Sequence, residues 1–198
     1  MPNIKEVKNR IGSVKSTQQL TKAMKMVAAA KLKRAQDKVT ELRPYSNKLN
    51  EILSNLSDSI SNVLFEQRDV KSKLFIVVAS DKGLCGSFNS NIFKLFNSVS
   101  ENNNDHLDSI NILPIGKKAY DFIKKKDYNL IDQFWNTLNG FSYADASNIF
   151  DYVQDEYLNN NIDQVHIIYN EFKNVAVQNS IVEQFLPVEN NLEKDSKE

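Results

Sequence analysis

Residues 4–32 read IKEVKNRIGSVKSTQQLTKAMKMVAAAKL and set the architecture of the chain. Apolar residues recur here every three or four positions, except in the middle, where Gln18, Thr21 and Lys25 occupy the same stripe. Such a repeat keeps one side of a helix facing a partner helix. The repeat continues in phase beyond Pro44, so we expect a bend there rather than a stop. The resulting prediction is one helix over Ile4–Leu64, whose apolar stripe we call the seam. The seam comprises Ile4, Val7, Ile11, Val14, Leu32, Val39, Leu42, Leu49, Leu53, Leu56, Ile60 and Val63.

Such a helix is too long to be covered by the rest of the chain. At 1.5 Å per residue it would extend for roughly 90 Å, whereas a domain built from the other residues would be about 30 Å across. Most of the seam must therefore meet another surface. The stretch Met24–Leu32 is rich in alanine and methionine, which favours a close or shifting contact; strong helix propensity alone is the simpler explanation.

The charges of the chain are unevenly distributed. Residues 1–43 hold eleven lysines and arginines against three acidic residues, a net charge of +8, although the whole chain is neutral. A basic rod indicates an acidic counterpart in nucleic acid, anionic lipid or protein. A solvated coiled-coil face is an equally good explanation of the charge alone.

The composition fits a water-soluble protein of a reducing compartment. Apolar residues make up 41% and charged residues 25%, and the sequence has neither an apolar run long enough to cross a bilayer nor a signal-peptide core. Cys85 is the single cysteine, which excludes an internal disulfide. His106 and His166 lie far apart in the sequence, so we expect no Cys/His metal site.

Residues 67–188 predict an open, mainly parallel α/β domain, because apolar strands alternate with helices. The shaft helix would occupy residues 1–66, and the acidic residues 189–198 would be a disordered tail. The expected strands are Leu74–Ala79, Ile110–Ile115, Tyr128–Phe134, Val165–Phe172 and Val175–Leu186, and the expected helices are 90–100, 117–126 and 143–159.

The side chains that could carry chemistry have simpler structural explanations. The loop Ser80–Asn89 follows the first strand, where such folds bind ligands, but it matches no phosphate-binding motif. We interpret Cys85 as a small buried residue and His166 as a core or interface histidine. Asp145, Asp151, Asp155 and Glu156 would form a solvated acidic face, and Lys124, Lys125 and Lys126 a solvated basic one. We therefore expect no catalytic site.

Ile4–Leu32 closely resembles the opening helix of the gamma subunit of F-type ATP synthases. Further matches in family order are Arg43-Pro44-Tyr45, Ser80–Asn89, Tyr169–Phe172 and Val182–Pro187. The resemblance implies a long coiled-coil-type helix followed by a Rossmann-like α/β domain. It also implies a non-catalytic rotor subunit without cofactor or metal, which couples proton-driven rotation of the c-ring to ATP synthesis in the alpha–beta hexamer.

The resemblance further implies partners and a location. The partners would be the alpha, beta and epsilon subunits and the c-ring, with no nucleic acid and no direct insertion into the membrane. The chain would lie on the cytoplasmic side of the inner (plasma) membrane, as a peripheral part of the complex. The residues expected at the acidic lever segment of beta are Met24, Lys25, Ala28 and Lys31, followed by Lys15, Lys22, Lys33 and Arg34.

In the family a second long helix follows the late strands and pairs with the first. The sequence here stops at Glu198 without it; a truncated gene, a fragment or a partner segment on another polypeptide would each explain this. We expect the free chain to self-associate through the seam. The alternative functions are a nucleic-acid-binding α/β protein with a basic arm, which the apolar seam argues against, and a flavodoxin-like enzyme, which would need a phosphate loop.

Overall fold

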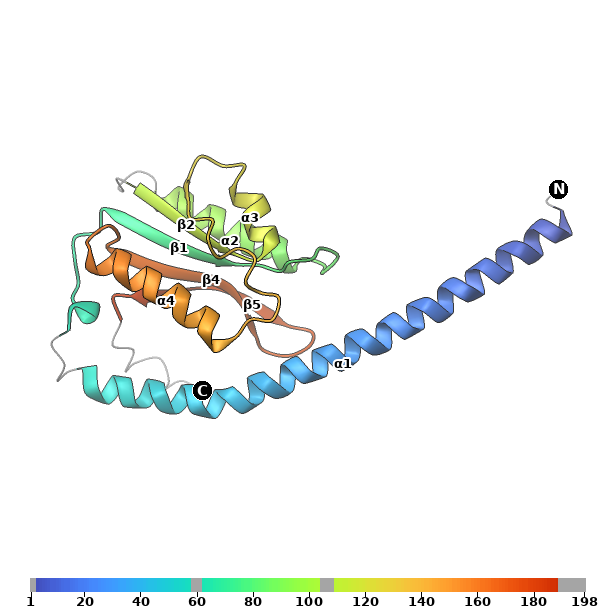
Figure 1. The fold of residues 1–198 in the computed structure, drawn as a ribbon, viewed down its shortest axis with the longest axis horizontal. Coiled ribbons are helices and arrows are strands. Elements are labelled where there is room, and N and C mark those ends of the chain that lie inside the picture. The colour runs from blue at the N-terminus through green and yellow to red at the C-terminus, as the bar shows by residue number, and fades with distance from the viewer. Residues whose placement is uncertain (1–2, 58–61, 104–108, 189–198) are drawn as a thin grey trace. The chain divides into compact units, whose positions relative to one another are not determined.

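A computed structural model describes residues 3–57, 62–103 and 109–188 of the chain. The chain divides into two compact units, Met1–Asp58 and Ser59–Glu198. The first unit is a helix and the second is an α/β domain (Figure 1). We describe each unit separately.

The helix α1 spans Ile4–Ser57 and is continuous through Pro44. Its 54 residues correspond to a length of about 80 Å, and Figure 1 shows it curving along its course. Proline removes one backbone donor but leaves the flanking turns intact, which agrees with the predicted bend without a stop. Asn3 begins the helix, because its side-chain oxygen accepts a hydrogen bond from the Lys5 N–H at 3.2 Å.

The predicted end of the long helix at Leu64 is wrong. A separate 3-10 helix, Val63–Phe65, is capped by the side chain of Asn62. Leu64 packs against the core of the α/β unit, and its carbonyl accepts a hydrogen bond from the Val188 N–H at 2.8 Å. Val63 is therefore not part of the α1 seam, because tertiary contacts place this turn with the second unit. Ile60 lies outside the described residues.

The α/β unit contains one five-stranded sheet of order β3-β2-β1-β4-β5. Its strands are β1 (Ser72–Val78), β2 (Ser109–Ile115), β3 (Asn129–Leu130), β4 (Gln164–Phe172) and β5 (Gln178–Leu186). All neighbours are parallel except β4 and β5, which form an antiparallel pair. The central strands are buried on both faces, which explains their continuous apolar sequences. The predicted fold class is confirmed.

Two helices cover one face of the sheet and one covers the other (Figure 1). Helices α2 (Phe88–Asn103) and α3 (Lys117–Ile123) lie over Phe75, Val77 and Ile112. Helix α4 (Tyr143–Leu158) lies over Leu74, Ile76 and Leu113, and buries its own Val153 and Tyr157. This unit thus covers its apolar strands with its own helices.

Two strands are shorter than predicted. The third strand has only two residues, because the chain then crosses the end of β2, where the Gly116 N–H donates to the Trp135 carbonyl at 2.9 Å. The fifth strand begins at Gln178 rather than Val175, because Asn174 closes a turn by accepting hydrogen bonds from the N–H groups of Ala176 and Val177. The predicted tail, residues 189–198, lies outside the described residues.

Candidate functional site

The seam of α1 is exposed wherever its side chains are described. Ile4, Val7, Ile11, Val14, Leu32, Val39, Leu42 and Leu49 all have exposed side chains, and that of Leu42 is 63% exposed. The side chains of Leu53 and Leu56 lie outside the described part of the chain. These side chains form two exposed apolar stretches, Ile4–Val14 and Leu32–Leu49. They indicate an interaction surface, because soluble proteins seldom leave contiguous apolar area in water.

Basic side chains run beside the seam on the same helix. Lys8, Lys15 and Lys22 follow one another at seven-residue spacing, which places them in one row along α1. Lys31 and Lys38 repeat the same spacing further along the helix. All five are exposed. The seam is therefore an apolar stripe with basic borders, suited to a partner that is apolar in the middle and acidic at its edges.

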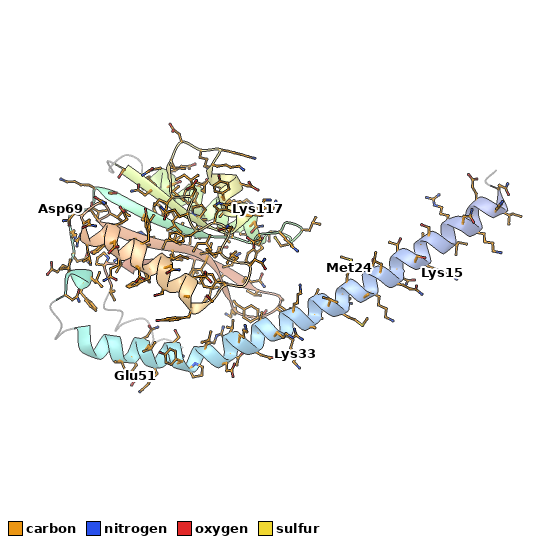
Figure 2. The ribbon with its side chains drawn as sticks, viewed as in Figure 1. Lys15, Met24, Lys33, Glu51, Asp69 and Lys117 are labelled. Carbon is orange, nitrogen blue, oxygen red and sulfur yellow. The ribbon has the colours of Figure 1, made fainter. Side chains whose placement is uncertain are left out.

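The residues predicted to contact the hexamer lie on this helix and are exposed. They are Met24, Lys25, Ala28, Lys31, Lys15, Lys22, Lys33 and Arg34. Figure 2 shows Lys15, Met24 and Lys33 projecting from α1. The Met24 side chain is 64% exposed, and Met26 and Val27 beside it are exposed too. Their role in binding remains a prediction.

Side-chain hydroxyls explain how polar residues fit into the middle of the helix. Ser16, Thr17 and Thr21 donate to the carbonyls of Gly12, Ser13 and Thr17, respectively, at 2.8–3.1 Å. Each hydroxyl thus has a partner four residues earlier in the same helix. Such bonds compete mildly with helical hydrogen bonds, so this stretch gains less helical stability than the alanine-rich one after it.

The loop Ser80–Asn89 is closed by its own side chains. Asn89 accepts a hydrogen bond from the Ser80 N–H at 3.1 Å, and its amide donates to the Ser80 hydroxyl and to Cys85 Sγ, at 2.9 and 3.2 Å. Asp81 Oδ1 accepts from the Lys117 N–H at 3.0 Å, at the start of α3. The loop is thus held together by its own side chains and tied to α3, which supports the structural interpretation of this loop.

Two predictions about single side chains are wrong. Cys85 is exposed rather than buried, because left-handed backbone conformations at Leu84 and Gly86 turn this part of the loop outward. Lys126 is only half-exposed: its Nζ donates to Asn97 Oδ1 at 2.6 Å and lies 4.8 Å from the Phe122 ring centroid. Long lysine stems bury readily against aromatic rings. Lys124 and Lys125 are exposed as predicted.

His166 is half-buried in the α/β unit, where it packs against Phe75 of the core. Its ring stacks on that of Phe75 at a centroid distance of 5.6 Å, and its buried Nδ1 has no hydrogen-bond partner among the described residues. Burial, with a smaller contribution from the charge of Lys73, lowers the pKa of His166 to about 4. The ring is therefore neutral at pH 7.

The predicted acidic face on α4 also contains a structural cap. Ser142 and Asp145 form a capping box at the start of the helix, in which each side chain bonds the other residue's backbone N–H. The Ser142 hydroxyl and backbone lower the pKa of Asp145 by donating to its carboxylate. No group of three or more His, Cys, Asp or Glu side chains within the described residues could hold a metal ion.

Comparison with known proteins identifies what the chain resembles. The family model described as ATP synthase matches residues 3–198. The ATP synthase gamma chain of Cytophaga hutchinsonii is 46% identical over 195 residues, covering 95% of this chain and 66% of the relative. That of Chloroherpeton thalassium is 44% identical over 197 residues, covering 95% and 64%. The chain thus spans about two thirds of the length of these curated relatives.

Solved structures give the same result for the fold. The central stalk and c-ring structure of the Tetrahymena thermophila mitochondrial ATP synthase contains a chain that is 31% identical with a TM-score of 0.65, covering 85% of this chain and 72% of that one. A rotor chain of the Euglena gracilis mitochondrial ATP synthase, 19% identical with a TM-score of 0.59, shares the fold. No helix in the described ranges is long and apolar enough to cross a membrane.

Proposed function

This chain belongs to the ATP synthase gamma-chain family, and on that premise we propose that it is the central-stalk rotor subunit of an F-type ATP synthase. It couples proton-driven rotation of the c-ring to ATP synthesis in the alpha–beta hexamer. The observation that carries this proposal is the exposed seam with its basic borders on α1. A shaft needs a surface that other chains can hold along its length, and α1 has one.

Two kinds of contact would hold the shaft. A second helix packs on the apolar seam and forms a coiled coil, since the seven-residue repeat requires a helical partner. The exposed lysines beside it face acidic surfaces of the hexamer, with Met24, Lys25, Ala28 and Lys31 at the acidic lever segment of beta. Each exposed ion pair contributes only about 0–1 kcal/mol, so the shape of the shaft carries more of the coupling than any single charge.

The chain acts without a catalytic site of its own. In the loop Ser80–Asn89, where an α/β fold would bind a nucleotide, Asp81 already bonds the start of α3. Nucleotide chemistry would then take place in the beta subunits. The α/β unit would face the epsilon subunit and the c-ring, and the chain would reside at the inner (plasma) membrane on its cytoplasmic side, held there through the complex. The nucleic-acid-binding alternative has no support from the related proteins.

Co-purification with alpha and beta subunits tests this function. We expect one copy of the chain per hexamer when the three are expressed together, with a peptide supplying the second helix. Val14→Glu places a charge on the seam and should reduce incorporation at least tenfold. Gln19→Glu adds the same charge outside the seam and is the matched control. A hexamer that purifies without the chain under these conditions would refute the coupling role.

A further inference from the structure

The sequence contains one Asn-Gly pair, Asn139-Gly140, in the segment that leads from β3 into α4 (Figure 1). The backbone nitrogen that follows an asparagine can attack the side-chain amide carbon and close a five-membered ring. A side chain on the following residue hinders this approach, and glycine has none. Asn-Gly is also a common turn pair, so the surroundings of the pair must decide whether it is a reactive site.

Both residues of the pair are exposed, and neither reacting group is held by a hydrogen bond. Among the described residues, no partner bonds the Gly140 N–H or the Asn139 side-chain amide. The hydrogen bond of this turn passes over the pair, because the Phe141 N–H donates to the Leu138 carbonyl at 3.5 Å. The Asn139 side chain can therefore turn towards the Gly140 nitrogen without losing a hydrogen bond of its own.

Gly140 also has open space around it. Its φ is 84°, and a Cβ built on it would meet no atom within 4 Å. Gly116 has a similar φ of 95°, but there a Cβ would lie 2.0 Å from the Ala79 carbonyl oxygen. Packing closes the turn at Gly116, whereas the turn at Gly140 leaves room for a ring and for a water molecule that attacks it.

Fixed residues lie on both sides of the pair. Leu138 packs against the core of the α/β unit. Ser142 is the N-cap of α4 and forms the capping box with Asp145. Any change in the length of the backbone at position 139 must therefore be absorbed between two anchored points.

We propose that Asn139 is a deamidation site whose main product is an isoaspartate. The Gly140 nitrogen forms a bond to Asn139 Cγ, the Cγ–Nδ2 bond breaks, and Nδ2 leaves as ammonia with the proton of the Gly140 N–H. Water then opens the cyclic imide at one of its two carbonyl carbons. One opening gives an aspartate, and the other gives an isoaspartate, in which the main chain runs through the former side chain. Each product adds one negative charge, and the inference is independent of the proposed function.

The site is tested on the full native chain incubated at mildly alkaline pH, with peptide mapping by mass spectrometry. Asn136 is the internal control, because it is exposed in the same segment but precedes Thr137, whose N–H donates to the Phe134 carbonyl at 3.3 Å. We expect deamidation at Asn139 to be at least tenfold faster than at Asn136, and within tenfold of its own rate in guanidinium chloride. Equal rates at the two asparagines, or strong protection of Asn139 in the native chain, would overturn the proposal.

Substitutions identify the reacting atoms. Asn139→Gln would require a larger ring and should abolish ammonia release from this peptide without affecting the fold, because the Asn139 side chain makes no hydrogen bond. Gly140→Ala should slow the reaction at least tenfold by placing a Cβ beside the nucleophile. Asn136→Gln is the matched control and should leave the rate at Asn139 unchanged. Undiminished ammonia release from Asn139→Gln would refute the assignment.

The isoaspartate has a readout of its own. A carboxyl methyltransferase that acts on isoaspartate should transfer labelled methyl groups from S-adenosylmethionine to the aged chain, in the peptide that contains position 139. The aged chain should also unfold at a lower urea concentration than Asn139→Asp, because the isoaspartate lengthens the backbone between Leu138 and Ser142, whereas a negative charge near the start of α4 is tolerated. Absence of methylation, or equal unfolding of the two chains, would contradict the isoaspartate product.

Discussion

The two units of this chain use the same apolar residue types in opposite ways. In the α/β unit Leu113, Ile123 and Val153 are wholly buried, each in contact with elements of the same unit. In α1, Val14 and Leu42 are more than half exposed. Burial of apolar area is the main source of folding free energy. The α/β unit therefore stabilises itself, whereas α1 gains most of its stability from whatever covers its seam.

Replacing a glycine by alanine should have the largest difference in effect on stability between the two units. A Cβ at Gly116 would lie 2.0 Å from the Ala79 carbonyl oxygen, at a φ of 95°. We expect Gly116→Ala to destabilise the α/β unit by more than about 3 kcal/mol, measured by urea unfolding of the fluorescence of Trp135. Gly12 has no atom within 4 Å of such a Cβ, so Gly12→Ala should stabilise α1 by about 1 kcal/mol without changing the Trp135 transition. A loss of less than about 1 kcal/mol in Gly116→Ala would contradict this prediction, because it would mean that the turn rearranges to accept the Cβ.

Leucine truncations test the comparison directly. Leu113→Ala should cost roughly 2–5 kcal/mol, since it leaves a cavity in a closed core. Leu42→Ala should cost less than about 0.5 kcal/mol in the free chain, because that side chain is already in water. Both are read by urea unfolding, with circular dichroism added for the helix. Equal costs would show that the seam is covered in the free chain, for example by self-association.

Acid should destabilise one unit and spare the other. In the folded chain the pKa of His166 is lowered from 6.5 to about 4. The unfolded chain therefore binds a proton more readily, so the free energy of unfolding is highest above pH 6.5 and decreases as the pH falls from 6.5 towards 4. Allowing for solvent screening, we expect a loss of about 1–2 kcal/mol. His166→Phe keeps the stack on Phe75 and should remove this part of the pH dependence. The described residues of α1 include no histidine, so its helicity should change less than the stability of the α/β unit as the pH falls from 6.5 to about 5.

The sequence was sufficient for features with a strong period or a continuous apolar run. The α1 repeat and the strands β1 and β2 fall in this class. The residues of the α1 stripe all lie on one side of the helix, and the central residues of β1 and β2 are all buried. Sequence reasoning failed where a distant backbone group decides the structure. The separate turn Val63–Phe65 is held by the Leu64 contact with Val188, and the length of β3 is set by the Gly116 contact with Trp135.

The candidate site likewise has a part that the sequence predicts and a part that it does not. The seam follows from its period, but the conformation of Leu84 could not be predicted, because the neighbouring glycines were the natural candidates for left-handed backbone. The flanking pair Gly83 and Gly86 was the available signal, since a loop with two glycines around a leucine and a cysteine permits an outward turn. Leu84 and the exposure of Cys85 were missed for that reason.

The hydrogen bond between the Val188 N–H and the Leu64 carbonyl has a topological consequence. It ties together the first and last described parts of the α/β unit, so the two ends of the described segment lie at adjacent backbone positions. An insertion or deletion in a surface loop between Leu64 and Val188 would therefore leave these two backbone positions adjacent.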